Sequence, residues 1–263
     1  MAISFVFGGI VYGQDVHFTQ FYASPLTLNP ALTGYFDGSW RVSAIYRNQW
    51  RSIGKHPFST VGLGFDKPFF HNGEQINAGF VYVNDQSGVA NLNSHRVYLN
   101  ISYLKKIKKN DVAIGIQPGF VIEYNNINKY SFDSQYDIGN PNIFNRDYSN
   151  AESGFNKSVN FFDLNAGVLW SNQLTKGFKP EAGFTLMHIT RPTRSLKNVK
   201  NDTTRFAIRK VFSGGATIKL SPKTRLKPNI LYMYQKKATD MLLGTNIEFD
   251  LPNPTFKTVY GGT

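Results

Sequence analysis

The chain of 263 residues contains no cysteine, so it can form neither a disulfide framework nor a thiolate metal site. It also has no run of 18 or more apolar residues, which excludes a helical membrane span. No convincing amphipathic helix separates its strand-like segments. These absences leave a membrane protein possible, because outer-membrane barrels alternate apolar and polar residues and their averaged hydropathy looks soluble.

Acidic residues are scarce: 17 Asp and Glu stand against 29 Lys and Arg, for a formal net charge of +12. Such an excess indicates nucleic-acid binding when it is gathered on one helix or surface. Here the positive residues are spread over expected loops and strand ends, as in Lys105, Lys106, Lys108 and Lys109. The sequence therefore predicts no nucleic-acid partner.

Motifs of catalysis and metal binding are also missing. The five histidines, His17, His56, His71, His95 and His188, include no HExxH and no pair at metal-ligand spacing. No Gly-x-Ser-x-Gly elbow is present, and no triad spacing accompanies His188. We therefore expect no catalytic residue, no cofactor and no metal, and the chain is not predicted to be an enzyme.

What the sequence does have is alternation, which is clearest in residues 111–124, DVAIGIQPGFVIEY. A strand points successive side chains to opposite faces, so this pattern predicts one apolar face and one small or polar face. It is longer than the about 9–11 residues that a tilted strand needs to cross a bilayer. The apolar face consists of Val112, Ile114, Ile116, Pro118, Phe120, Ile122 and Tyr124, and the opposite face of Ala113, Gly115, Gln117, Gly119, Val121 and Glu123.

The same alternation recurs along the chain and predicts about ten strands in all. Gly214–Gly215 is expected to bend the long eighth segment. The other segments are 40–46, 61–65, 76–82, 97–103, 162–170, 182–186, 204–220, 230–234 and 241–249. Aromatic residues near the strand ends predict interfacial girdles in a barrel, or core residues in a soluble sandwich: Trp40, Tyr46, Trp50, Tyr82, Tyr103, Tyr124, Trp170 and Tyr232.

Both ends of the chain differ from the strand region. Residues 1–13 are apolar and end in small residues, which predicts a signal-peptide remnant, although they lack an initial Lys or Arg. Residues 14–34 contain Pro25, Pro30 and Gly34 as breakers and are expected to form an irregular plug. After Phe249 no closing strand is recognisable, so the barrel is expected to be truncated, because lipid does not satisfy an open sheet edge.

Connection lengths also favour a barrel, in which short periplasmic turns lie opposite longer outer loops. The outer loop 125–158, rich in Asn, Asp, Ser and Tyr, is where we expect partner contact. The turns expected on the periplasmic side are 66–75, 105–111, 171–179 and 220–225. The connections expected on the outer side are 84–94, 125–158 and 189–203, together with the shorter 50–57 and 235–238.

These observations predict an all-β protein, an antiparallel transmembrane β-barrel. Its parts are a signal remnant at 1–13, an irregular plug segment at 14–34 and the barrel at 35–263. The alternative is a soluble secreted β-sandwich, in which the apolar faces would pack inward against a second sheet. Strand length and loop asymmetry favour the barrel.

Several motifs closely resemble the PorP/SprF family, and the resemblance runs over nearly the whole chain. Near the N-terminus they are QDVHFTQFY at 14–22, Pro25, NPA at 29–31 and TG at 33–34. Arg41, YRNQW at 46–50 and FST at 58–60 follow. Later matches are GFTLMH at 183–188 with Pro192, and FSGGA at 212–216.

Members of that family are outer-membrane β-barrels of the type IX secretion system in Bacteroidetes. The resemblance therefore implies an outer-membrane protein that supports secretion or surface attachment of cargo, including gliding-motility adhesins. The implied partners are the type IX translocon, its periplasmic components, the C-terminal signal domains of secreted cargo and outer-membrane lipid.

The signature residues are candidates for contacts between the plug segment and the barrel wall. Proline fixes φ and restricts the residue before it, so Asn29–Pro30 predicts a fixed turn, which alone would also explain these residues. Arg47, Gln49 and Trp50 end the first strand, where they could hold the segment. The full candidate set is Gln20, Tyr22, Asn29, Pro30, Arg41, Arg47, Gln49 and Trp50.

Three functions remain open at this point. The favoured hypothesis is a barrel that docks partner proteins through its loops and its N-terminal segment. The second is an outer-membrane channel that passes small solutes through a polar lumen. The third is a soluble sandwich that binds surface ligands.

Overall fold

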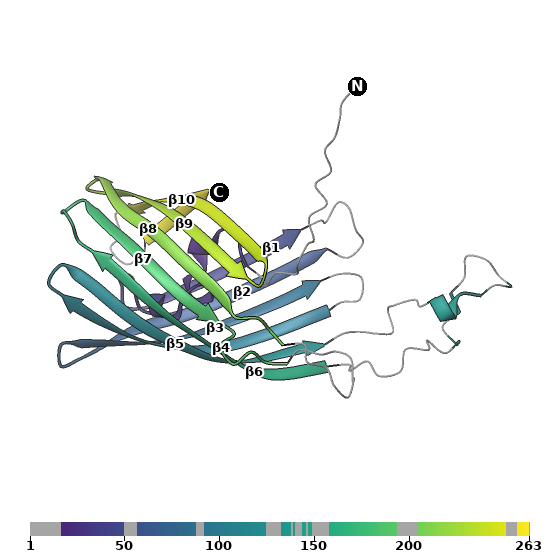
Figure 1. Cartoon of the computed structure of the whole chain (residues 1–263). Helices are drawn as coiled ribbons and strands as arrows, with labels where there is room; N and C mark the ends of the chain where they lie inside the picture. The colour runs from purple at the N-terminus through teal and green to yellow at the C-terminus, as the bar shows by residue number, and fades with distance from the viewer. Residues whose placement is uncertain are drawn as a thin grey trace, which may run out of the picture.

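The computed structural model describes residues 17–49, 57–87, 92–124, 158–193 and 205–249, the backbone of 250 and 257–262, and short stretches within 133–148. These residues form one antiparallel sheet in which each strand pairs with the next in sequence. The sheet is strongly curled, so that its inner face surrounds an interior (Figure 1). No helix in the described part of the chain is long and apolar enough to span a membrane.

Eleven strands make up the sheet, and β2 to β6 are each 14 to 16 residues long. That length exceeds the about 9–11 residues needed to cross a bilayer. The strands are β1 (Arg41–Gln49), β2 (Phe58–His71), β3 (Glu74–Ser87), β4 (Leu92–Ile107), β5 (Asn110–Tyr124), β6 (Ser158–Asn172), β7 (Phe178–Met187), β8 (Arg209–Ser221), β9 (Thr224–Gln235), β10 (Ala238–Asp250) and β11 (Lys257–Gly262).

The two faces of the sheet have opposite chemistry, as β5 illustrates. Ile114 and Ile116 on its outer face are 56% and 51% exposed, whereas Ala113 and Gln117 on its inner face are 1% and 2% exposed. This confirms the orientation predicted from the alternation in residues 111–124.

The whole sheet follows this inverted arrangement, with apolar side chains exposed and polar side chains buried. Large exposed hydrophobic residues cover the outside of β1 to β10, and no second sheet packs on them in the described part of the chain. Buried polar residues of the strands include Thr60, Asp66, Asn77, Asn100, Gln117, Glu123, Asp163, Asn165 and Thr185. This is the pattern of a lipid-facing barrel wall with a polar interior, and it rules out the sandwich.

The connections divide between the two ends of the sheet as the sequence predicted. One end, which we call the turn end, carries the hairpins β2–β3, β4–β5, β6–β7 and β8–β9 (Figure 1). Three of these hairpins have two-residue turns. In one of them, Asn72–Gly73, the φ values of 49° and 79° are both positive, as in a type I′ turn, which matches strand twist. At the opposite end, the loop end, lie the strand ends that flank the connections 50–57, 88–91, 125–157, 188–208 and 236–237.

Three details differ from the expectation. β8 begins at Arg209 rather than at 204, and Phe206 instead packs inside against Phe161, with ring centroids 5.6 Å apart. The strand continues through Gly214–Gly215, and its register shifts at Lys219–Ser221. An eleventh strand, β11, pairs with β10 beyond the Pro-rich turn, where no strand was expected.

The apolar core lies between the inner face and the N-terminal segment, of which residues 17–34 are described. Three clusters form it, and each contains residues of this segment. Phe21 and Leu28 pack on β7 to β9, Leu26 packs on β3 to β6, and Ala31 packs on β4 to β6. The barrel therefore builds its core against its own N-terminal segment.

Candidate functional site

The N-terminal segment is a chain of three 3-10 turns, η1 (Phe21–Ala23), η2 (Pro25–Thr27) and η3 (Pro30–Leu32). Pro25 and Pro30 each occupy the first position of a turn, where a missing N–H costs nothing. Asn29 caps η3, because its side-chain oxygen accepts a hydrogen bond from the Ala31 N–H at 2.9 Å. The breakers in the sequence thus produce a compact, internally bonded segment.

Glycines in neighbouring strands leave the space in which η3 lies. A Cβ on Gly115 of β5 would sit 2.4 Å from the Pro30 carbonyl carbon. A Cβ on Gly167 of β6 would sit 2.1 Å from Asn29 Oδ1, and one on Gly183 of β7 would sit 2.9 Å from Asn29 Nδ2. Any larger residue at these positions would displace the segment.

Asn29 also joins the segment to the wall directly. Its Nδ2 donates to the Val168 carbonyl of β6 at 3.0 Å, while Pro30 stacks its backbone over Gly115. Both Asn29 and Pro30 are buried. The turn is therefore both fixed internally and bonded to the barrel wall.

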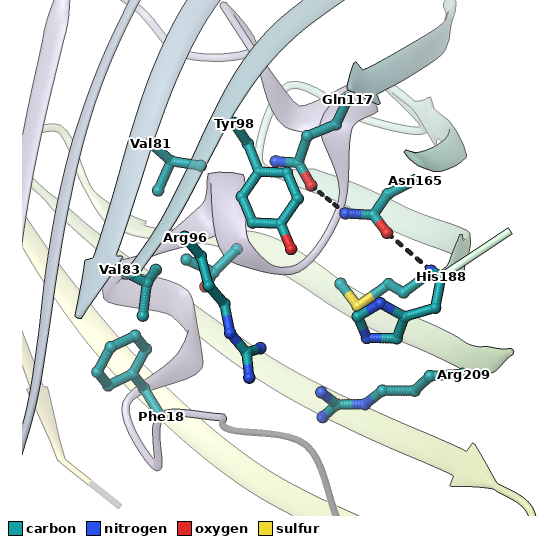
Figure 2. A pocket seen from close by; sticks show the side chains of 11 residues that line it. Phe18, Val81, Val83, Arg96, Tyr98, Gln117, Asn165, His188 and Arg209 are labelled. Carbon is teal, nitrogen blue, oxygen red and sulfur yellow. Dashed lines mark hydrogen bonds between the residues drawn. The ribbon is translucent and has the colours of Figure 1, made fainter. Parts of the chain in front are cut away.

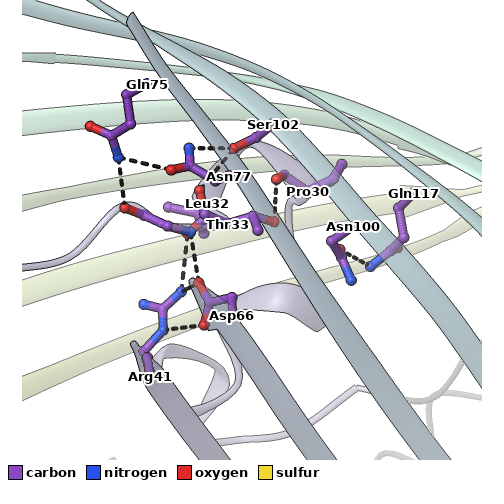
Figure 3. Close-up of polar contacts among 11 residues, drawn as sticks. Pro30, Leu32, Thr33, Arg41, Asp66, Gln75, Asn77, Asn100, Ser102 and Gln117 are labelled. Carbon is purple, nitrogen blue, oxygen red and sulfur yellow. Dashed lines mark hydrogen bonds and ion pairs between the residues drawn. The ribbon is translucent and has the colours of Figure 1, made fainter. Parts of the chain in front are cut away.

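A buried ion pair secures the end of the segment where it enters β1 (Figure 3). Asp66 of β2 is 1% exposed and accepts two hydrogen bonds from Arg41, from Nε at 2.9 Å and from Nη2 at 2.8 Å. Asp66 also accepts from the Gly34 N–H at 2.7 Å, and Arg41 donates to the Leu32 carbonyl at 3.0 Å. Both charges therefore hold the backbone of the segment.

A second group of contacts lies beside this pair on β3 and β4 (Figure 3). Ser102 donates to the Thr33 carbonyl at 2.8 Å and accepts from Asn77 Nδ2 at 2.8 Å. Gln75 donates to Asn77 Oδ1 at 2.9 Å and to the Gly34 carbonyl at 3.2 Å. Polar residues of four strands thus converge on residues 32–34.

The middle of the segment meets a buried amide network (Figure 2). Gln117 donates to the Leu26 carbonyl at 2.8 Å and to Asn100 Oδ1 at 2.6 Å. Asn165 donates to Gln117 Oε1 at 2.6 Å and accepts from the backbone N–H of His188 at 2.9 Å. The network therefore joins η2 to β4, β5 and β6.

Asp163 forms the next layer of this interior. It is fully buried and accepts from the Tyr98 hydroxyl at 2.9 Å, and its Oδ2 lies 2.8 Å from His188 Nδ1. A cavity of about 50 Å³ is lined by Tyr98 and His188, together with Arg96 and Arg209 (Figure 2). Within the described residues no three His, Cys, Asp or Glu side chains are grouped as metal ligands.

At its outer end the segment contacts the first and tenth strands. Arg47 donates to the His17 carbonyl and, at 3.2 Å, to Thr60, which in turn donates to Asp85 at 2.6 Å. His17 Nδ1 lies 4.0 Å from Asp240 of β10. His17 thus lies between β1 and β10 and contacts both strands.

The remaining candidate residues are placed differently. Gln20 is exposed and offers no side-chain cap to η1. Tyr22 packs edge-on against Phe21, and its hydroxyl is buried without a hydrogen-bond partner in the described structure. Gln49 is exposed at the end of β1, and Trp50 lies outside the described residues.

The predictions for residues 1–13 and for the loop 125–158 concern residues that lie largely outside the described part of the chain. The proposed signal remnant at 1–13 lies wholly there. Of the proposed contact loop 125–158, the structure describes η5 (Asp133–Gln135) and a bridge between Tyr136 and Phe144.

Sequence reasoning missed the wall residues that hold the segment, chiefly Asp66, Asn77, Ser102 and Gln117. Each lies on the small or polar face of an alternating strand. A polar residue among small residues on that face was the sequence signal that could have identified these wall residues.

Tyr35, just after the segment, was also missed. Its hydroxyl lies 2.5 Å from Ser171 of β6, and Lys179 of β7 lies 5.0 Å from its ring centroid. Burial raises the pKa of the Tyr35 phenol above its usual value, so the hydroxyl keeps its proton at neutral pH. These contacts join the exit of the segment to β6 and β7.

No curated protein matches the chain. Among solved structures, a point mutant of the ferric enterobactin receptor PfeA from Pseudomonas aeruginosa is similar, with a TM-score of 0.34 and 10% identity, over 81% of this chain and 37% of the receptor. The model of the protein family described as "Type IX secretion system membrane protein PorP/SprF" matches residues 10–263. The chain therefore belongs to the PorP/SprF family of type IX secretion system membrane proteins.

Proposed function

We propose that this protein is a non-enzymatic docking component of the type IX secretion system in the outer membrane. The observation that carries the proposal is that the interior is occupied by the protein's own N-terminal segment. Leu26, Ala31 and Thr33 of that segment are 1%, 0% and 0% exposed. A wall built around an internal segment presents its loops and rims, rather than an open lumen, to other molecules.

The occupied interior favours docking over a solute channel. The cavity beside Gln117 and His188, of about 50 Å³, has room for only a few water molecules. Hydrated ions or small metabolites need a continuous wider path. A channel remains the second candidate, because polar residues line the inner face.

Family membership and the difference between the two ends of the barrel support the choice of partners. The loop end would hold the translocon and the C-terminal signal domains of cargo, including gliding-motility adhesins. The turn end would meet periplasmic components, because outer-membrane barrels place short turns on that side.

Binding and conductance together test the proposal. The full-length protein is reconstituted in planar bilayers, with a porin as the positive control. It is also titrated with a purified C-terminal signal domain from a type IX cargo, with an unrelated β-domain as the negative control. We expect a silent bilayer and saturable binding of the cargo domain alone. Stepwise conductance without cargo binding would instead establish the channel.

A further inference from the structure

Six lysines that are scattered in the sequence lie together at the turn end. Lys106, Lys108 and Lys109 belong to the β4–β5 hairpin, Lys176 to the β6–β7 hairpin, and Lys219 and Lys223 to the β8–β9 hairpin. All six are exposed. We call this group the lysine arc.

Backbone hydrogen bonds between neighbouring hairpins make the arc continuous. The Gln173 N–H donates to the Lys109 carbonyl at 2.8 Å, which joins the first hairpin to the second. The Lys219 N–H donates to the Gly177 carbonyl at 2.8 Å, which joins the second to the third. With strands about 4.8 Å apart, β4 to β9 place these lysines along an edge of roughly 24 Å.

Two acidic residues near the arc form ion pairs with other cations. Asp111 pairs with Lys179 at 2.6 Å, and Glu248 pairs with Arg225 at 3.1 Å and with Lys227 at 2.9 Å. None of the six arc lysines forms an ion pair with another described residue. Their six charges amount to half of the formal net charge of +12.

The arc faces the mouth of the barrel more than the lipid. Strand alternation places Lys106 on the inner face with buried Leu104, and Lys219 on the inner face with buried Val211. The other four lysines lie at or beside the hairpin tips. Headgroup-binding lysines would instead occupy outward positions such as that of Lys105.

We propose that the lysine arc is a docking surface for an acidic protein on the turn-end side of the barrel. This inference rests on the proposed function, since it takes the turn end to face the periplasm. A row of like charges with no local partner raises the encounter rate with a complementary acidic surface and fixes its orientation.

A matched pair of double variants tests this surface. Lys109→Glu/Lys176→Glu reverses two adjacent arc charges. Lys210→Glu/Lys236→Glu reverses two exposed lysines at the loop end and is the control. Each protein, in phosphatidylcholine nanodiscs, is titrated with a fluorescent oligoglutamate peptide. Heat-modifiable gel mobility verifies that both variants are folded.

We expect the arc variant to bind the peptide about tenfold more weakly than the unaltered protein, with the control changed less than about twofold. Binding should also fall steeply between about 50 mM and about 500 mM NaCl. Equal weakening in both variants, or no binding by the unaltered protein, would overturn the proposal. It would do so without affecting the cargo-domain titration, so the two failures are distinguishable.

A lipid experiment separates headgroups from protein. Retention of phosphatidylglycerol from mixed micelles is measured for the same three proteins. We expect equal retention by all three. Loss of phosphatidylglycerol from the arc variant, with its peptide binding unchanged, would assign the lysines to lipid and overturn the proposal.

Discussion

Adding one methyl group at Gly115 tests whether the shape of the inner face fixes the N-terminal segment. In Gly115→Ala the new Cβ would lie 2.4 Å from the Pro30 carbonyl carbon and 2.5 Å from the Ala31 nitrogen, whereas ordinary contact begins near 3.4 Å. Both atoms are backbone, so no side chain can rotate away. The segment must move by about 1 Å, and overpacking of this kind costs about 1–3 kcal/mol.

The assay uses the absence of cysteine from the chain. Ser24 is 2% exposed, so a Ser24→Cys background reports the opening of the segment through its rate of maleimide labelling. A cost of about 1–3 kcal/mol, if it weakens the docking of the segment alone, accelerates labelling about 5–150-fold. Gly177→Ala is the control, because a Cβ there would meet nothing closer than 3.7 Å. Equal labelling rates in the two variants would refute the claim that the shape of the inner face fixes the N-terminal segment.

Three further substitutions probe the wall and its interior. Ile114→Arg, on the lipid-facing side of β5, should destabilise the barrel in lipid vesicles by about 2–4 kcal/mol in urea titration, and an unchanged midpoint would contradict a lipid-facing position. Asp66→Asn should cost about 3 kcal/mol in the same titration, because it leaves Arg41 without its buried partner; a loss under about 1 kcal/mol would show that the pair is dispensable. Tyr98→Phe removes one hydrogen bond to buried Asp163 and should cost about 1.5–3 kcal/mol, so a neutral result would contradict the interior network.

The orientation of the wall could be predicted because it depends on a local pattern. Alternation with period two assigns each residue of 111–124 to one face without knowledge of its neighbours. Hairpin connections then place successive strands side by side, so the order of the sheet follows from the chain. Both features were predicted correctly.

The contacts of the interior could not be predicted, because they depend on register between distant segments. Gly115 and Pro30 are 85 positions apart, and only the path of the N-terminal segment brings them together. The alternation alone does not distinguish Asp66 from the other residues on the small or polar face of β2. Its role depends on Arg41 and Gly34, which only the fold brings beside it. The lysine arc could not be predicted for the same reason, because its lysines come from three hairpins that only the sheet brings together.

β11 was missed for a different reason. It follows Pro252 and Pro254 and ends in Gly261–Gly262, a composition that disfavours strands. It forms where the edge of β10 offers backbone groups for pairing.

The central claim is that lipid contacts one face of these strands while the other face encloses the N-terminal segment. Spin labels placed singly at 112–114, 116, 117 and 120–122, in protein reconstituted in vesicles, test it through relaxation by oxygen and by a water-soluble nickel complex. Position 115 is left unlabelled, because a side chain there would displace the N-terminal segment. We predict high oxygen access at Val112, Ile114, Ile116, Phe120 and Ile122, and low access to both agents at the positions between them. Oxygen access that is uniform, or highest at the odd positions, would contradict the membrane assignment.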